Sequence, residues 1–77
     1  MQITSQYIQD KLTENLKFTD LKIQVIAKDD AFSYIQLNLE CQELKQMSMV
    51  KSHQMILNVF KNELESNIIH AITINIK

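Results

Sequence analysis

The sequence contains no glycine and no proline. Glycine is indispensable to the Walker phosphate loop, the dinucleotide-binding fingerprint, the nucleophile elbow of hydrolases and the GxxG clamp of KH domains. All four motifs are therefore excluded. The absence of proline also removes proline turns and fixed kinks. The turns of this chain must be made by Asn, Asp, Ser and Lys.

Other residue types are scarce in ways that exclude further classes. A single cysteine rules out an internal disulfide framework and a zinc ribbon. The longest uninterrupted apolar runs are two or three residues, which is too short for a membrane span or a signal-peptide core. We therefore expect no membrane association and a cytoplasmic location.

The size and charge of the chain set the remaining limits. Its 77 residues allow one small domain, residues 1–77, and 45% of them are hydrophobic. The formal net charge is −1, and all eight basic residues are lysines. This balance argues against a dedicated nucleic-acid binder that is driven by electrostatics.

The first half of the chain predicts a helix and a β-hairpin. Residues 4–17 have an apolar stripe at every fourth position, with Thr4 as the N-cap and Ile3 and Ile8 as a hydrophobic staple. Residues 21–27 and 32–40 alternate between apolar and polar side chains, which is typical of strands. The turn between these strands is predicted at 28–31.

The second half predicts a short connection, a long helix and a third strand. Residues 42–47 are polar and form at most one helical turn, and Ser48 then caps a helix to about Glu65. Asn67 is predicted to end this helix in the left-handed conformation. Residues 69–76 alternate again. The apolar arc predicted for the long helix comprises Met49, Val50, Ile56, Leu57, Phe60 and Leu64.

The predicted order is therefore α-β-β-α-β, with a possible split in the second helix. A helical crossover that returns to the sheet favours parallel pairing with the strand it left. We expect an α+β fold with a three-stranded mixed sheet that is covered by helices on one face.

Few residues could carry chemistry. No pair of His, Cys or carboxylate residues has zinc-ligand spacing, and Asp29 and Asp30 are interpreted as a solvated turn. We therefore expect a protein that is not an enzyme. His53 is interpreted as a half-buried structural residue inside the apolar arc, and Cys41 as a buried, inert thiol. Met47, Met49 and Met55 are interpreted as gap-fillers in the core.

Three lysines, Lys45, Lys51 and Lys61, could form a weak basic strip along the second helical region. Lysine lacks the bidentate fork with which arginine binds phosphate and guanine. Glu40, Glu43 and Glu63 also dilute this strip. A solvated helix face is the favoured interpretation, with weak DNA binding as the alternative.

Two segments resemble the BolA family, within its short bacterial branch. They are Met47-Ser48-Met49-Val50-Lys51-Ser52-His53-Gln54 and Ile69-His70-Ala71-Ile72-Thr73-Ile74. The resemblance extends over essentially the whole chain. It implies a fold like that of a type II KH domain without its GxxG loop, in agreement with the predicted order of elements.

The resemblance also implies a function. BolA-like proteins pair with monothiol glutaredoxins and share a 2Fe–2S cluster with that partner and glutathione, in iron–sulfur trafficking and iron regulation. His70 matches the family's C-terminal ligand histidine. The family's second ligand is a His or Cys in or just after the hairpin loop, where this chain has Lys28–Ala31 and then Tyr34, neither of which offers a good iron–sulfur ligand. Cys41 is the next candidate for that ligand.

Three hypotheses remain open from the sequence. The first is a non-enzymatic adaptor that docks on a monothiol glutaredoxin with His70 at the cluster. The second is a DNA-binding transcriptional regulator or stress morphogen that uses its helical face, and the third is an interaction module that has lost its ligand chemistry. Alone, the protein could be a monomer or a homodimer.

Overall fold

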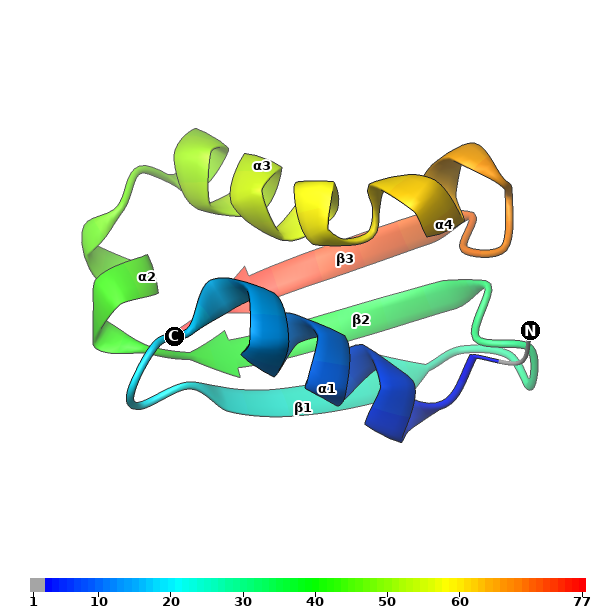
Figure 1. The fold of residues 1–77 in the computed structure, drawn as a ribbon, viewed down its shortest axis with the longest axis horizontal. Helices are drawn as coiled ribbons and strands as arrows, with labels where there is room; N and C mark the ends of the chain where they lie inside the picture. Colours follow the sequence, from blue (N-terminus) through cyan, green and yellow to red (C-terminus); the bar gives the residue numbers. More distant parts are fainter. Residues whose placement is uncertain (1–2) are drawn as a thin grey trace.

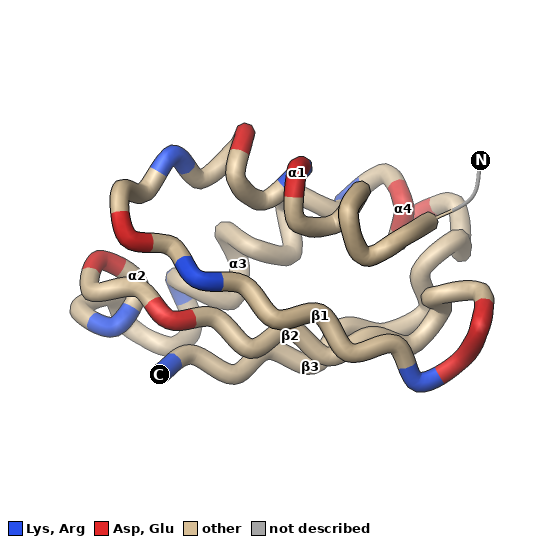
Figure 2. The backbone as a smooth tube through the Cα atoms, turned by 90° about the horizontal axis from the view of Figure 1, so that it is seen from below, with Lys and Arg blue, Asp and Glu red and all other residues tan. Residues whose placement is uncertain are grey.

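The computed structural model describes residues 3–77, and these form a helical layer on one face of a three-stranded sheet (Figures 1 and 2). The elements are α1 (Ser5–Leu16), β1 (Lys22–Ala27), β2 (Tyr34–Glu40), α2 (Gln42–Gln46), α3 (Met49–Val59), α4 (Lys61–Glu65) and β3 (Ala71–Ile76). The sheet order is β1-β2-β3, antiparallel between β1 and β2 and parallel between β2 and β3. The predicted α+β class, element order and mixed sheet are confirmed.

Side chains at the helix ends fix where the helices begin and stop. The hydroxyl of Thr4 accepts a hydrogen bond from the N–H of Tyr7, and the hydroxyl of Ser48 accepts one from the N–H of Lys51, both at 3.1 Å. At the end of α4, Asn67 has φ 61°, in the left-handed region. These three predictions are confirmed.

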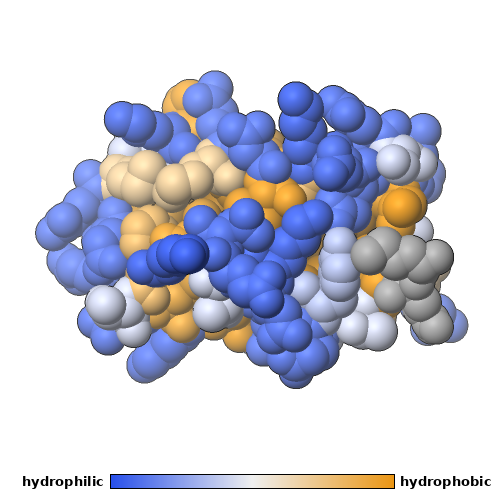
Figure 3. All heavy atoms as spheres, viewed as in Figure 1, coloured by the Kyte–Doolittle hydropathy of each residue, from blue (hydrophilic) through white to orange (hydrophobic). Residues whose placement is uncertain are grey.

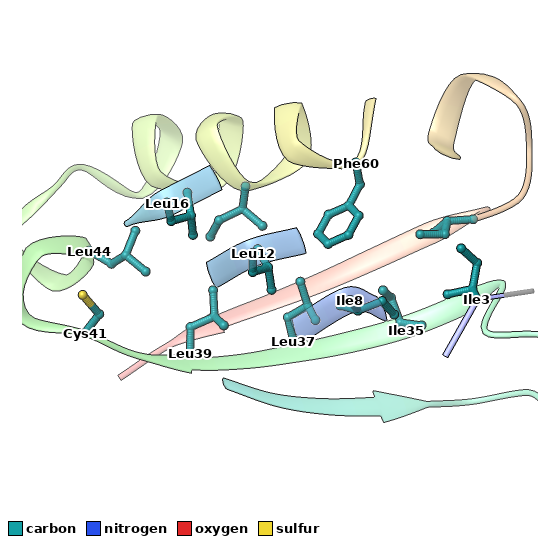
Figure 4. Packing of buried hydrophobic residues seen from close by; sticks show 12 residues of the cluster. Ile3, Ile8, Leu12, Leu16, Ile35, Leu37, Leu39, Cys41, Leu44 and Phe60 are labelled. Carbon is teal, nitrogen blue, oxygen red and sulfur yellow. The ribbon is translucent and has the colours of Figure 1, made fainter. Parts of the chain in front are cut away.

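The core lies between β2 and the helices. Ile35, Leu37 and Leu39 of β2 are buried on the face that meets Leu12 of α1 and Phe60 (Figure 4). The buried hydrophobic cluster comprises Ile3, Ile8, Leu12, Leu16, Ile35, Leu37, Leu39, Cys41, Leu44, Ile56, Phe60 and Ile69. β2 is the central strand, with β1 on one side and β3 on the other. Its inward side chains are therefore covered by the residues of α1 and α3 that belong to the core.

The predicted helix from Ser48 to Glu65 is divided at Phe60. The N–H of Phe60 bonds to the carbonyl of Leu57, three residues earlier, which tightens the last turn of α3 before α4 begins. The starts of all three strands also differ from the prediction, and β1 begins one residue later, at Lys22. β2 begins at Tyr34 because Phe32 has φ 58° and belongs to the turn, and β3 begins at Ala71.

The buried face of α3 matches the predicted arc only in part: Ile56 and Phe60 are buried as predicted. Ser52 and Ile56 are buried, whereas Met49 and Val50 are 74% and 67% exposed. Leu57, at 37%, is also exposed. The helix is rotated so that the stripe of Ser52, Ile56 and Phe60 meets the sheet. The role of Met49 as a core gap-filler was therefore wrong, whereas Met47 and Met55 are partly buried against the core.

Candidate functional site: the Tyr34–His70 end of the sheet

Two aromatic rings meet where β2 and β3 begin. Because these strands are parallel and Tyr34 pairs with Ala71, residue 70 lies next to the start of β2. The rings of Tyr34 and His70 stack, with centroids 5.5 Å apart and planes inclined by 21°. Both side chains are exposed. The imidazole predicted near the solvent end of the third strand is therefore at an open end of the sheet.

The hairpin loop holds both rings in place through its backbone. The carbonyl of Ser33 accepts hydrogen bonds from the N–H groups of His70 and Ala71, at 2.7 and 3.2 Å. The carboxylate of Asp29 accepts from the N–H groups of Ser33 and Tyr34, at 2.9 and 3.1 Å. The loop thus ties the start of β2 to the segment that carries His70.

These bonds also define the role of Asp29. The hydrogen bond from the backbone N–H of Tyr34, with others from the loop, lowers the pKa of the Asp29 carboxyl below its ordinary value. An ionised carboxylate that accepts from two backbone N–H groups organises a turn. Its neighbour Asp30 is exposed.

The ligand set around His70 is incomplete. The side chain beside His70 is the phenol of Tyr34, at the position where the family resemblance places a histidine. Residues 3–77 hold no group of three or more His, Cys, Asp and Glu side chains that could bind a metal ion. An imidazole such as that of His70 is a ligand type that iron–sulfur clusters accept, whereas the phenol of Tyr34 beside it is not a good one.

Cys41 cannot supply that second ligand. It is buried and follows the C-terminal end of β2 (Figure 4). His70 lies beside the N-terminal end of the same strand, where its N–H bonds to the carbonyl of Ser33. At about 3.3 Å per residue, the seven steps from Tyr34 to Cys41 span roughly 23 Å. Cys41 as the next ligand candidate was therefore wrong, while its burial was predicted correctly.

The three lysines of the predicted strip lie on separate helices: Lys45 on α2, Lys51 on α3 and Lys61 on α4. All three are exposed, and no acidic residue lies between Lys45 and Lys61 in the sequence, although acidic residues flank this segment on both sides (Figure 2). Glu63 was expected to dilute this strip from the surface, but it is buried. A common nucleic-acid role for the lysines stays a prediction.

His53 lines a groove of about 370 Å³ between α2, the start of α3 and the C-terminal half of β3. We call this feature the α3–β3 groove; its lining residues are Leu44, Lys45, Met47, Met49, Ser52, His53, Ile74, Asn75 and Ile76. Figure 3 shows apolar side chains between hydrophilic ones on this side of the molecule, over α2 and α3. The His53 side chain is half-buried, as predicted, but forms no side-chain hydrogen bond within residues 3–77.

A buried ionic network joins α1 to α4 and was missed by the sequence reasoning. One oxygen of Glu63, Oε2, accepts from the Tyr7 hydroxyl and from the Lys11 ammonium, each at 2.5 Å. The side chains of Lys11 and Glu63 are 24% and 4% exposed. The signal was present in the spacing, because Glu63 follows Phe60 by three residues and so continues the buried stripe.

Charge pairing outweighs desolvation in this network. Burial opposes ionisation of Glu63, but the hydrogen bonds from Lys11 and Tyr7 outweigh it, so the pKa of Glu63 lies below its ordinary value. Burial likewise opposes the charge of Lys11, and its bonds to Glu63 and Tyr7 raise its pKa. The bond to Glu63, aided by burial, raises the pKa of Tyr7. Lys11 and Glu63 therefore form a charged ion pair at neutral pH, and its role is structural.

Two solved structures of BolA proteins have a fold similar to that of this chain. BolA1 from Arabidopsis thaliana matches with a TM-score of 0.71, covering 100% of this chain and 93% of its own at 21% identity. The BolA domain of SufE1 from Arabidopsis thaliana matches with a TM-score of 0.71, covering 97% of this chain and 93% of its own at 26% identity. No protein-family profile and no curated protein sequence gives a match.

The chain therefore has the fold of the BolA family, and it is a BolA-like protein in its architecture. No helix among residues 3–77 is both long enough and apolar enough to span a bilayer.

Proposed function

We propose that this chain is a non-enzymatic, BolA-like partner of a monothiol glutaredoxin. In this proposal the His70 imidazole is its ligand to a 2Fe–2S cluster shared with that partner and glutathione, in iron–sulfur trafficking or iron regulation in the cytoplasm. The observation that supports it is the exposed imidazole of His70 at an open end of a BolA-like sheet. The backbone N–H of His70 is fixed by a hydrogen bond to the carbonyl of Ser33.

The surroundings of His70 suit a role at an interface. Its backbone N–H is fixed by the loop, while its side chain contacts Tyr34 through ring stacking. A partner can therefore reach the imidazole without unfolding any element. The cluster needs a second ligand from this side, and Tyr34 stands where that ligand would lie. We expect the heterodimer to form but to hold its cluster weakly.

The alternative role as a DNA-binding regulator or stress morphogen has less support. The net charge is −1, the chain has no arginine, and its eight lysines are offset by nine acidic residues. Tight binding to DNA depends on several phosphate contacts from basic side chains.

Co-purification with a monothiol glutaredoxin in the presence of glutathione tests the proposal. Visible absorption and circular dichroism report the shared cluster. His70→Ala should abolish the cluster signal but leave the fold intact, because the imidazole is exposed. His53→Ala is the matched control and should leave the signal unchanged. An unchanged spectrum in folded His70→Ala protein would refute the ligand assignment.

Tyr34→His tests the missing second ligand. It places an imidazole where the ring of Tyr34 now stacks on His70, 5.5 Å between centroids. We expect a longer cluster lifetime under chelator challenge than in the wild type. Tyr34→Phe keeps an aromatic ring without adding a ligand and should give no such gain. A wild-type cluster that is already stable and unaffected by Tyr34→His would mean that the second ligand lies elsewhere.

A further inference from the structure

The outer edge of β3 presents unpaired backbone. The N–H groups of Ala71 and Lys77 bond to carbonyls beside or on β2, at 3.2 and 2.9 Å. Since successive residues of a strand face opposite edges, Ile72, Ile74 and Ile76 turn their N–H and C=O groups to the other side. Within residues 3–77, β3 pairs with β2 alone.

The sequence and pairing of β3 lack three of the features that usually prevent strand addition. Ala71–Ile76 contains no charged residue and no proline, and its six-residue register with β2 has no bulge. Natural edge strands are commonly protected by lysine, proline, a bulge or a covering element. An extended segment can therefore align along β3 and form main-chain hydrogen bonds.

The α3–β3 groove provides side-chain contacts beside the same edge. It has a volume of about 370 Å³, and Ile74 and Ile76 form its wall on the β3 side. Met47 and Met49 line the opposite side, and Met49 is 74% exposed. Flexible methionine side chains adapt to varied apolar partners. The groove can thus accept alternate apolar side chains of a strand paired with β3.

The charge of the groove selects among possible occupants. Lys45 and His53 line it, and no Asp or Glu does. A second copy of this chain that paired through β3 would bring residues 66–77, which contain no acidic residue. The paired strand of such a copy would itself place no carboxylate in the groove. An acidic partner segment complements the groove better.

We propose that β3 and the α3–β3 groove bind an extended, acidic peptide segment of a partner protein. The segment adds a fourth strand to the sheet, places alternate apolar side chains in the groove and sets a carboxylate beside Lys45. Peptide recognition by strand addition takes its affinity from main-chain bonds and its specificity from alternate side chains. The groove includes none of the residues assigned to the cluster, so this inference does not depend on the glutaredoxin proposal.

Fluorescence anisotropy tests the inference with a defined probe. The probe is a short labelled peptide of alternating valine and threonine with aspartate at both ends. Its controls are the same peptide with lysine ends and the same peptide N-methylated at alternate amides. We expect the aspartate probe to bind, and both control peptides to bind at least several-fold more weakly. Equal binding of the N-methylated peptide would overturn strand addition.

A matched pair of variants tests whether the positive charge of Lys45 contributes to binding. Lys45→Glu should weaken binding of the aspartate probe about five-fold, from one attraction lost and one repulsion gained. Lys61→Glu makes the same change in net charge on α4, away from the groove, and should leave binding unchanged. Equal weakening by the two variants would overturn the assigned site, as would no binding at millimolar probe. A wild-type dimer in sedimentation velocity that the aspartate probe fails to dissociate would identify a second copy as the occupant and overturn the inference.

Discussion

Removal of Lys11 gives the sharpest test of the energetics of this fold. Lys11→Met takes away the ammonium that pairs with Glu63 but keeps a side chain of similar length. The Glu63 carboxylate, which is 4% exposed, would then keep the Tyr7 hydroxyl as its side-chain donor. Its second oxygen, Oε1, already has no partner within the described residues.

The expected loss of stability follows from the burial of the pair. Breaking a fully buried ion pair from one side costs about 3–5 kcal/mol. Lys11 is 24% exposed, so water already offsets part of its attraction to Glu63, and Tyr7 continues to donate. We therefore expect the free energy of unfolding to fall by about 2 kcal/mol. For a domain of this size, that change lowers the melting temperature by roughly 8–16 °C.

The pH dependence provides a second measurement. In the wild type the pKa of Glu63 is lowered, so its stabilising effect is present above the unfolded pKa and is lost as pH falls through the folded pKa. Without Lys11, burial still opposes ionisation of Glu63, while the bond and the charge of Lys11 that lowered its pKa are lost, so we expect this pKa to be higher than in the wild type. Protonation then relieves the buried charge. The stability gap between variant and wild type should be largest at neutral pH and narrow as pH falls to about 4.

Urea denaturation at several pH values measures this gap. Lys51→Met, which changes an exposed lysine of α3, is the control and should stay within about 0.5 kcal/mol of the wild type. The double variant Lys11→Met/Glu63→Gln should lose less than the sum of its single changes, because the two residues act as one unit. A Lys11→Met protein as stable as the wild type at neutral pH, or a gap that does not narrow in acid, would refute this reasoning.

Three further outcomes are expected. Asn67→Ala should cost about 1 kcal/mol in urea denaturation, because a residue with a Cβ and no capping amide resists the left-handed conformation, whereas Asn67→Gly should cost nothing. Met49→Ser should change stability by less than about 0.5 kcal/mol, while Ile56→Ala should cost about 2–5 kcal/mol, and equal losses would contradict the assigned face of α3. DNA binding by fluorescence anisotropy near physiological salt should be no tighter than roughly 10⁻⁶ to 10⁻⁴ M, and a nanomolar, sequence-selective complex would favour the regulator hypothesis.

Some features of the fold could be predicted from the sequence because they depend on a few neighbouring residues. The caps at Thr4 and Ser48 and the left-handed Asn67 are local in this sense. The alternation of Ile35, Leu37 and Leu39 identified the buried face of β2, since only one face of that strand is continuously apolar. The nature of the elements and their order followed directly.

The candidate site was predictable only in part. The resemblance singled out His70, and the start of a strand placed it near solvent, as the structure has it. Its stacking on Tyr34 could not be predicted, because it depends on the register that pairs Tyr34 with Ala71 across separate strands. The same register separates Cys41 from His70 by the length of β2.

Burial on α3 and α4 was decided by the tertiary structure. Ile56 and Phe60 of the predicted arc are buried. Burial also extends to Ser52, which lies outside that arc, and leaves Met49 and Val50 exposed. Helical periodicity states which residues share a face, but the position of the sheet determines which face is buried. Glu63 can be buried because Lys11 and Tyr7 of α1 donate hydrogen bonds to its carboxylate. These donors reach Glu63 only because α1 packs beside α4 in the folded protein.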